Sequence, residues 1–540
     1  MSRIPRSRKL VIASVVLLPL IGGGFMLQSR ATRGGQLLLD QVLSLVQDRF
    51  VDTLESGQLF EKAARGLVKE LNDPYSELLA PKELKQFTTN TGGRYGGIGM
   101  QIEPQQGQIV ISKVFPNTPA EAAGVHEGDR IVQVDTLQTR NWSTQQVSDY
   151  LTGTPGTKVT VKFARPGVTS AIEVRFTRAL IHVPAVRYAI SFGANGDKVG
   201  YIPLDRFNET AALEVQEAVK TLQKQGVRGI IVDFRGNPGG ILDQSLAISN
   251  LFLKEGQEIA SIRGRNGDQQ PYVSRGTPLL PSLPLIVLTD EYTASASEIV
   301  AGALQDHDRA LILGQTSFGK GLVQSVFNLD GGYALKLTTA KWYTPSGRSI
   351  QKERKFENGR FVDDEPDSTE TEQVKKTRPM YKSDAGRVVY GGGGITPDVI
   401  VADDTLTTTE QRLAKALATK QQDFYSTYYD YSLELSKQVS KDFAVQSMWR
   451  EEFLRRLQAK GVTVDRKDYD ASARYIERLL EQRVARFAFG DSAAKRRDLT
   501  YDAPLRKAID LLDKGGSQKE LLALASAEAA RTHAAQPKKQ

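Results

Sequence analysis

Apolar and polar positions alternate in a regular way through the middle of the chain. Between about residues 198 and 315, short apolar runs are separated by segments in which apolar residues recur every three or four positions. The runs are VGYIPL, GIIVDF, PLIVLT and ALILG, and the segments between them are AALEVQEAVKTLQKQG, ILDQSLAISNLFL and ASEIVAGALQD. The runs indicate buried strands and the wider spacing indicates helices. Strands and helices in alternation predict a layered α/β core.

The regions on either side have different patterns. Residues 36–87 have helical spacing, interrupted by a turn at Asp73-Pro74, and the chain is helical and charged again beyond about residue 403. Between them, short β-branched runs with Gly, Pro and Asn predict small strands and turns. Residues 353–394 are charged and glycine-rich, which predicts an excursion or a partly ordered loop. We therefore expect a helical region (32–91), a mostly-β domain (92–180), an α/β core (181–402) and a helical extension (403–540).

The first residues resemble an export segment. An uncharged apolar run, residues 10–27, follows four basic residues, Arg3, Arg6, Arg8 and Lys9. A basic stretch followed by an apolar one is typical of a secretion signal or a signal anchor. The run is at the lower limit for a membrane span of about 20 residues, and Pro19 weakens it as a helix. We expect residues 1–31 to direct export to the periplasm or cell envelope, whether they are cleaved or anchor the protein in the inner membrane.

Composition excludes several classes of site. The net charge of +8 over 540 residues is mild, and no dense basic cluster suggests nucleic acid binding. The absence of cysteine excludes disulfides, thiolate metal sites and a cysteine nucleophile. We expect neither a metal nor a cofactor.

The stretch GQTSFGKG begins like a phosphate-binding loop. From Gly314 to Lys320 it has the pattern G-x-x-x-x-G-K, but the Ser or Thr that should follow is Gly321. We therefore do not expect nucleotide binding. A solvated lysine in a hairpin is the simplest explanation of Lys320. An apolar setting that favours its neutral amine would instead make Lys320 a base.

Ser295 lies where an apolar strand is predicted to turn into a helix, in TASASE. The pattern S-x-x-E is a capping box, which alone explains the serine. Alternatively, Ser295 is a nucleophile, because a helix N-terminus and free backbone amides favour a developing oxyanion. Ser297 competes with it for either role.

The sequence offers few histidines that could act as the general base for such a serine. The chain has four histidines; we expect His182 in a connection and His307 to be exposed at a helix end. A lysine can replace histidine as the base. In the loop FRGNPGG, the dinucleotide-binding spacing is absent, and the amide of Gly240 could form half of an oxyanion hole or simply belong to a tight turn.

Together these three motifs resemble the carboxyl-terminal processing peptidases, or tail-specific proteases. The serine of TASASE and the lysine of FGKG are 25 residues apart here, as in that family, and WYTPSGRSIQ and GITPDVIV are further signatures. The resemblance spans about residues 37–401 and implies a crotonase-like spiral core. It implies Ser295 as nucleophile, Lys320 as base, Gln324 as the group that orients the lysine amine, and the amides of Gly240 and Ala296 as oxyanion donors. Because residues four apart on a straight strand are roughly 13 Å apart, Gln324 reaches Lys320 only across a bend.

Residues 92–179 resemble a PDZ domain, mainly through NTPAEAAGVHEGDRIVQV. The resemblance implies a carboxylate-binding loop made of Gly97, Ile98, Gly99 and Met100. Successive amides of such a loop bind a chain-terminal carboxylate while the peptide adds a strand to the sheet edge. A glycine hairpin without a ligand is the alternative.

The expected protein is an exported serine endopeptidase that recognises protein C-terminal tails. Its expected partners are substrates with exposed C-terminal tails, an adaptor or lipoprotein, and further copies of itself. The alternative is a PDZ adaptor or chaperone with a degenerate peptidase core. The helical extension could form an oligomer interface, a cap over the site, a docking surface, or only a solvated appendage.

Overall fold

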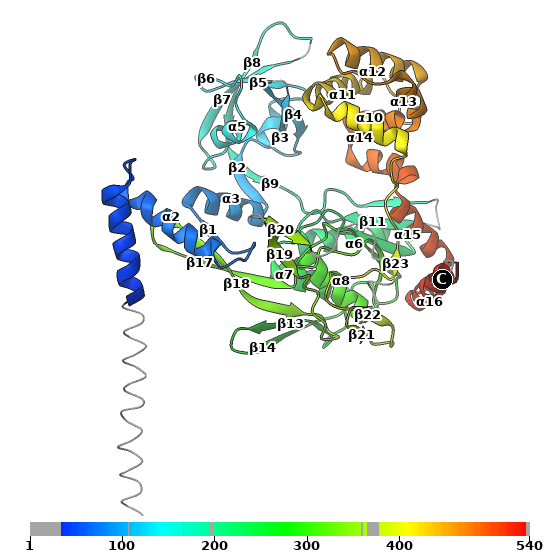
Figure 1. Cartoon of the computed structure of the whole chain (residues 1–540). Helices are drawn as coiled ribbons and strands as arrows, with labels where there is room; N and C mark the ends of the chain where they lie inside the picture. Colours follow the sequence, from blue (N-terminus) through cyan, green and yellow to red (C-terminus); the bar gives the residue numbers. More distant parts are fainter. Residues whose placement is uncertain are drawn as a thin grey trace, which may run out of the picture. The chain divides into compact units, whose positions relative to one another are not determined.

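The computed structural model describes residues 34–105, 107–165, 167–193, 198–357, 360–363 and 377–535. The predicted export segment, residues 1–31, lies outside the described residues. The chain forms two compact units, Met1–Pro81 with Gln324–Thr338 and Lys82–Val323 with Thr339–Gln540. The predicted fold class, a multi-domain chain of α/β and α+β parts, is confirmed (Figure 1).

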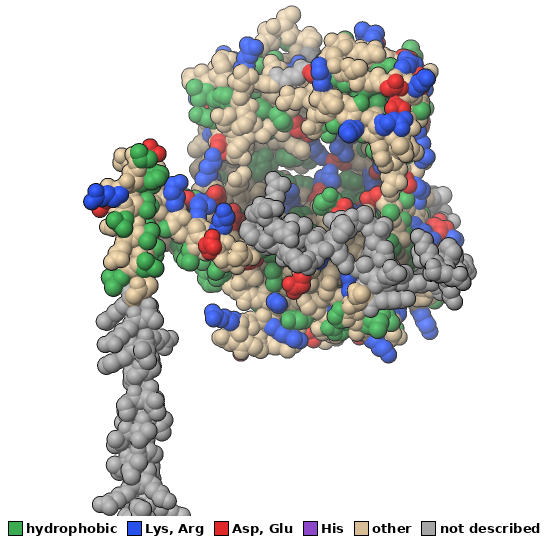
Figure 2. Space-filling view, in the orientation of Figure 1, with side chains coloured by type: hydrophobic (Ala, Val, Ile, Leu, Met, Phe, Trp, Pro, Cys, Tyr) green, Lys and Arg blue, Asp and Glu red, His purple; other side chains and the backbone are tan. Residues whose placement is uncertain are grey.

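The smaller unit contains helices and short strands. Residues 34–49 are helical, and α2 (Ser56–Lys69) and β1 (Glu77–Leu79) follow. β1 pairs antiparallel with residues 334–336 of β18 (Ala334–Tyr343), which β17 (Leu322–Asn328) also joins. The prediction of helices alone for this region is therefore wrong at β1, where a three-residue strand leaves no periodicity to detect. Along the helix of residues 34–49, large apolar side chains are exposed (Figure 2), among them Leu37, Leu38, Leu39, Val42 and Leu45.

A six-stranded sheet forms the centre of the larger unit. Its order is β10-β11-β12-β15-β16-β23; β10 is antiparallel to β11 and the other pairs are parallel. The four predicted apolar runs form β11, β12, β15 and β16, as expected of a layered core. The strands are β10 (Ile190–Phe192), β11 (Val199–Pro203), β12 (Gly229–Asp233), β15 (Leu285–Thr289), β16 (Leu311–Gly314) and β23 (Val399–Ile400).

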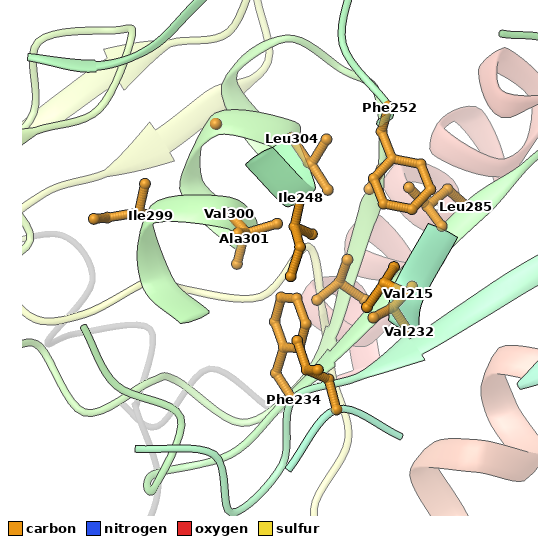
Figure 3. Close-up of a cluster of buried hydrophobic side chains, with 14 of the residues drawn as sticks. Val215, Val232, Phe234, Ile248, Phe252, Leu285, Ile299, Val300, Ala301 and Leu304 are labelled. Carbon is orange, nitrogen blue, oxygen red and sulfur yellow. The ribbon is translucent and has the colours of Figure 1, made fainter. Parts of the chain in front are cut away.

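Helices cover both faces of this sheet. Side chains alternate along a strand, so Ile230 and Val232 join one hydrophobic cluster and Ile231 joins the other. The first cluster contains α6 (Ala211–Lys224), α7 (Leu242–Asn250) and α8 (Ala296–Asp306), as Figure 3 shows in close-up. The second contains α15 (Ala503–Lys514) and α16 (Gln518–Ala535). The end of the helical extension is thus part of the peptidase core.

The segment predicted to be mostly β forms its own antiparallel sheet, in the order β3-β4-β5-β7-β8 with β6 beside β5. Strand β3 lies at an edge, and a separate pair, β2 with β9, joins the two ends of the segment. His182 therefore lies in a strand and not in the expected connection. The elements are α3 (Pro81–Gly92), β2 (Arg94–Gly97), β3 (Met100–Gln105), β4 (Gln108–Val114), α4 (Pro119–Ala122), β5 (Arg130–Val134), β6 (Leu137–Gln138), α5 (Thr144–Leu151), β7 (Lys158–Ala164), β8 (Ile172–Thr177) and β9 (Ala179–His182).

Two further groups of elements complete the larger unit. The first part of the helical extension has its own apolar core, made by α10 (Thr408–Ala418), α11 (Gln421–Ser436), α12 (Ser447–Ala459), α13 (Arg466–Ala471) and α14 (Ala473–Asp498). The predicted excursion forms hairpins where it is described, β19 (Arg354–Glu357) with β20 (Arg360–Asp363) and β21 (Met380–Lys382) with β22 (Val388–Tyr390). β13 (Glu258–Gly264) pairs with β14 (Gln269–Val273) and with residues 340–343 of β18. In the described ranges, no helix has both the length and the apolar character of a membrane span.

Candidate active site

Ser295 lies on the turn between β15 and α8 and directly precedes the helix. Its backbone has φ 56° and ψ −114°. A residue with a side chain rarely adopts a positive φ, and such a conformation costs on the order of 1–3 kcal/mol unless its surroundings hold it. Ser295 is partly exposed, whereas Ala294 and Ala296 beside it are buried. A strained serine between two small residues at a helix N-terminus is what a nucleophile turn requires.

The carboxylate of Glu298 connects this turn to the loop that carries Lys320. Glu298 is completely buried. It accepts hydrogen bonds from the amides of Ser295 (2.7 Å), Gly319 (2.6 Å) and Lys320 (2.9 Å) and from the hydroxyl of Ser317 (2.5 Å). One side chain thus fixes two segments that are 25 residues apart.

At Glu298 the effect of burial outweighs that of hydrogen bonding, so the pKa of the carboxyl is raised. Burial raises the pKa of the Glu298 carboxyl, while the bonds from Ser317, Lys320, Gly319 and Ser295 act to lower it. The S-x-x-E pattern predicts only a capping-box role for Glu298, and the bond from the Ser295 amide is the reciprocal half of that box. Nothing in the sequence indicated its bonds to the lysine loop.

Ser297 does not share the position of Ser295. It is completely buried, and its hydroxyl donates to the carbonyl of Asn237 at 3.2 Å. The amide of Ala294 donates to the same carbonyl at 3.0 Å. Ser297 therefore holds the serine turn against the loop FRGNPGG, which leaves Ser295 as the candidate nucleophile.

The loop between β12 and α7 lies against Ser295. A Cβ atom added to Gly239, which has φ +92°, would be 2.8 Å from the nitrogen of Ala296 and 2.9 Å from the Cβ of Ser295. A Cβ on Gly240 would be 2.2 Å from the carbonyl oxygen of Phe207. Glycine is therefore required at both positions: a side chain on Gly239 would force the loop away from the serine turn, and one on Gly240 would clash with the backbone of Phe207.

One of the two predicted oxyanion donors, the amide of Ala296, lies in this contact, and the other belongs to Gly240, the residue after Gly239. In the part of the chain that the structure describes, we find no acceptor for the amide of Gly240 or of Ala296. The loop is also held by Asp290: the amide of Gly236 donates to both carboxylate oxygens of this residue, at 3.0 and 2.9 Å. Free, fixed amides beside a serine can stabilise an oxyanion without reorganisation.

Lys320 lies in the loop between β16 and β17 and is half-buried. Its carbonyl accepts a hydrogen bond from Nε1 of Trp342 at 3.0 Å, and the amide of Gly321 donates to Oε1 of Gln351 at 2.9 Å. A Cβ on Gly319 would be 3.1 Å from the nitrogen of Gly394. Residues of WYTPSGRSIQ and GITPDVIV thus surround the lysine loop, which is why these motifs accompany FGKG.

Gln324 belongs to the smaller unit. It lies on β17, and its side-chain amide donates to Oγ1 of Thr338 at 3.3 Å. Its role in orienting Lys320 stays a prediction.

The prediction that His307 is exposed is wrong. Only 9% of its side chain is accessible, because β13 and the turn around Asp384 cover it. Its Nδ1 lies 2.8 Å from the carboxylate of Asp384 and its Nε2 lies 2.7 Å from the carbonyl of Glu258. His182 is engaged by Glu214 at 2.9 Å. Neither histidine is placed to act on Ser295. Across the described ranges we find no group of His, Asp and Glu that could hold a metal ion.

The predicted carboxylate-binding loop connects β2 to β3. Gly97 ends β2, Met100 begins β3, and Gly99 has φ +90° with Thr118 so close that a Cβ would lie 2.3 Å away. The carbonyl of Ile98 accepts from the amide of Ala120 at 2.8 Å. This bond connects the loop to α4, to which Ala120 belongs.

The side chain of Tyr95 lies on this loop. A Cβ on Gly97 would be 2.5 Å from the tyrosine ring. Burial raises the pKa of Tyr95 to about 12, against a hydrogen bond from the amide of Met100 that lowers it. The hydroxyl of Tyr95 therefore lies close to the amide of Met100 in the predicted loop.

Comparison with known proteins identifies two families in this chain. The model of peptidase family S41 matches residues 198–358, which contain Ser295 and Lys320, and the PDZ domain model matches residues 96–176. The solved structure of a photosystem II D1 C-terminal processing protease is 28% identical, covers 69% of this chain and 89% of its own, and has a TM-score of 0.37.

Two curated relatives extend over most of their own length. The carboxy-terminal-processing protease of Bartonella bacilliformis is 38% identical over 315 residues, 57% of this chain and 71% of the relative. The carboxy-terminal processing protease CtpA of Bacillus subtilis is 31% identical over 345 residues, 63% of this chain and 73% of the relative. The chain therefore belongs to the carboxy-terminal processing proteases, serine peptidases of family S41 that carry a PDZ domain.

Proposed function

We propose that this protein is an exported endopeptidase in which Ser295 attacks the peptide bond and the neutral amine of Lys320 takes the proton from its hydroxyl. The observation that carries the proposal is the buried carboxylate of Glu298, which binds the amides of both residues. A nucleophile and its base have to be held in one geometry, and a shared anchor does this for segments far apart in sequence.

The steps follow from the groups around Ser295. The hydroxyl oxygen adds to the substrate carbonyl as its proton passes to Lys320, and the amides of Gly240 and Ala296 stabilise the oxyanion together with the N-terminus of α8. Lys320 then gives the proton to the leaving amine, and an ester to Ser295 remains. Water, activated by the same lysine, hydrolyses that ester. Gln324 is proposed to orient the lysine amine.

The PDZ domain is proposed to select substrates that have an exposed C-terminal tail. Strand β3 lies at a sheet edge, so a peptide can add to it as a further strand while its carboxylate binds the amides of Ile98, Gly99 and Met100. We further propose residence in the periplasm or cell envelope, with residues 1–31 as signal or inner-membrane anchor. The exposed apolar side chains of residues 34–49 favour self-association, and α10–α14 offer a surface for an adaptor or lipoprotein.

The test is hydrolysis of a tail-bearing protein by purified Ser295→Ala and Lys320→Ala variants. Each should lose activity by roughly 10⁴-fold or more, because nucleophile and base act as a unit. Ser282→Ala, which changes an exposed serine just before β15, is the control. In the parent enzyme the rate should rise with pH as the lysine amine becomes neutral. Undiminished hydrolysis by Ser295→Ala would refute Ser295 as the nucleophile, whereas absence of hydrolysis by the parent protein would favour the adaptor or chaperone alternative.

A further inference from the structure

The loop that carries Gly240 is tied to the C-terminal helices by a buried ion pair. Arg235 is the arginine of FRGNPGG, and Asp502 precedes α15 as its N-cap. The two nitrogens Nη1 and Nη2 of Arg235 donate to Oδ1 and Oδ2 of Asp502, each at 2.9 Å. Only 16% of the arginine side chain and 5% of the aspartate side chain are exposed. A planar, bidentate pair fixes the orientation of the guanidinium as well as its position.

A second carboxylate holds the other side of Arg235. Its Nε and Nη2 donate to Asp233, which ends β12, at 3.0 and 2.6 Å. Asp233 also accepts from the hydroxyl of Tyr201 at 2.7 Å. Arg235 therefore bridges the end of a central strand and the start of a C-terminal helix, and its orientation depends on both.

The charge of Asp502 is well supported. Burial disfavours its ionised form, but the hydrogen bonds and charges of Arg235 and Lys495 outweigh burial and hold the pKa of Asp502 well below its usual range. The Nζ of Lys495 lies 2.6 Å from Oδ2 of Asp502. At neutral pH the pair is thus fully charged.

We propose that Asp502 is a positioning residue of the active site, which acts through Arg235 to hold Gly236–Gly240 against the Ser295 turn. The inference rests on the proposed function, since it assumes that the Gly240 amide stabilises the oxyanion. The path is short: Gly236 follows Arg235 and is bonded to Asp290, and Gly239 lies in contact with Ala296 and Ser295. The helical extension is accordingly a part of the catalytic apparatus.

Helix α15, which Asp502 precedes, also provides a matched control. Its C-terminal end is tied to the sheet by an ion pair between Asp513 and Arg228, which directly precedes β12. Arg228 and Asp233 lie at opposite ends of that strand, and only the end at Asp233 leads into the catalytic loop. Loss of either pair loosens α15, but only loss of the pair at Asp502 should disturb the oxyanion hole.

The variant Asp502→Asn separates the charge from the helix cap. Asp502 accepts a hydrogen bond from the amide of Leu505 at 3.0 Å, and Asn caps helices about as well as Asp. The substitution keeps that bond and removes the charge that Arg235 binds.

The experiment compares full-length parent, Asp502→Asn and Asp513→Asn on a tail-bearing substrate. We expect kcat of Asp502→Asn to fall about 10- to 100-fold with KM changed less than about twofold, since small displacements of catalytic groups act on the transition state. Asp513→Asn should stay within about twofold of the parent in kcat. Hydrogen exchange of the amides of residues 236–241 should be faster in Asp502→Asn only. Asp502→Glu keeps the charge on a longer side chain and should recover part of the lost kcat.

Three outcomes would overturn the proposal. These are parental kcat in Asp502→Asn, equal losses in Asp502→Asn and Asp513→Asn, or unchanged exchange of residues 236–241. If Asp502→Asn does not fold, Asp502→Glu carries the test, and equal kcat and exchange in that variant and the parent overturn the proposal. Ser295→Ala is measured alongside. Its retention of activity would refute the catalytic assignment, whereas the exchange measurement reports on the tether itself.

Discussion

Two regions of this molecule direct several backbone amides toward one acceptor position. The two regions differ in the group that occupies that position. In the peptidase core, the amides of Ser295, Gly319 and Lys320 converge on the carboxylate of Glu298, which belongs to the chain and is completely buried. In the PDZ domain, the amides of Ile98, Gly99 and Met100 are proposed to await a carboxylate from another chain. Close to one of them, the amide of Met100, lies the neutral hydroxyl of Tyr95.

The difference explains how one fold can be rigid at one loop and receptive at the other. A permanent carboxylate with four donors is costly to displace, because each unpaired buried donor costs about 1–3 kcal/mol. A neutral hydroxyl makes one weaker bond, and a charged carboxylate can replace it with charge-assisted bonds. In the proposed function, catalysis gains a fixed geometry from the first arrangement, and recognition gains an exchangeable site from the second.

The largest expected effect comes from removal of the acceptor that belongs to the chain, the carboxyl group of Glu298. In Glu298→Gln one acceptor oxygen becomes an NH₂ group that faces the donors, so the loops of Ser295 and Lys320 should separate. We expect kcat to fall about 100-fold or more, by the reasoning that applies to misplaced catalytic groups. The measurement is steady-state hydrolysis together with tail-peptide affinity, which should not change.

The matched control for this variant is Glu217→Gln, an exposed glutamate on α6. It should behave like the parent enzyme in both measurements. A Glu298→Gln enzyme with parental kcat would show that contacts other than those of Glu298 hold the loops of Ser295 and Lys320 together.

A smaller effect should follow from removal of the exchangeable acceptor. Tyr95→Phe keeps the ring on Gly97 but frees the amide of Met100 for a ligand carboxylate. Since an average hydrogen bond contributes about 0.5–1.5 kcal/mol, the Kd of a tail peptide should fall about 2- to 10-fold. Fluorescence anisotropy of a labelled peptide on the full-length Ser295→Ala protein measures it.

Tyr272→Phe, on β14 of the core, is the control for a lost tyrosine hydroxyl. Unchanged or weaker peptide binding by Tyr95→Phe would mean that the tyrosine hydroxyl does not compete for the loop.

The sequence predicted the elements of the core well because their signals are local. The apolar runs around Ile231 and Ile286 and the helical spacing of residues 211–224 each lie within one element, and the strands and helices form there. The three-residue strand β1 has no such signal, since it depends on pairing with a partner more than 250 residues away. His307 was misjudged for the same reason: the residues that cover it, Glu258 and Asp384, are distant in sequence.

The site was predictable in its residue types and not in its connections. Ser295 and Lys320 could be named from motifs, but the positive φ of Ser295 and the fourfold role of Glu298 arise only when the two loops meet. Likewise the pair of Arg235 with Asp502 joins residues 267 positions apart, and neither carries a pattern that selects the other. A capping glutamate and a loop arginine have ordinary local explanations, so tertiary contacts had to reveal their second roles.

The smallest expected effect concerns pH and distinguishes the two regions further. Burial raises the pKa of Glu127 in the PDZ domain to about 7, with the charge of Asp491 adding to the rise and that of Lys113 opposing it. A carboxyl with a raised pKa favours the folded state when it is neutral, so its contribution is complete below about pH 4.5 and is lost as the pH rises through about 7. Relative to Glu127→Gln, the parent should therefore lose stability between pH 5 and pH 8. We expect a difference of about 2 to 4 °C in the first thermal unfolding midpoint to develop over this range. Glu173→Gln, which changes an exposed glutamate of the same domain, should parallel the parent at every pH. If the Glu127→Gln and parent curves stay parallel, Glu127 is ionised throughout this pH range. The PDZ domain would then contain no carboxyl at this position whose pKa is raised by folding, and the contrast with Glu298 would not hold.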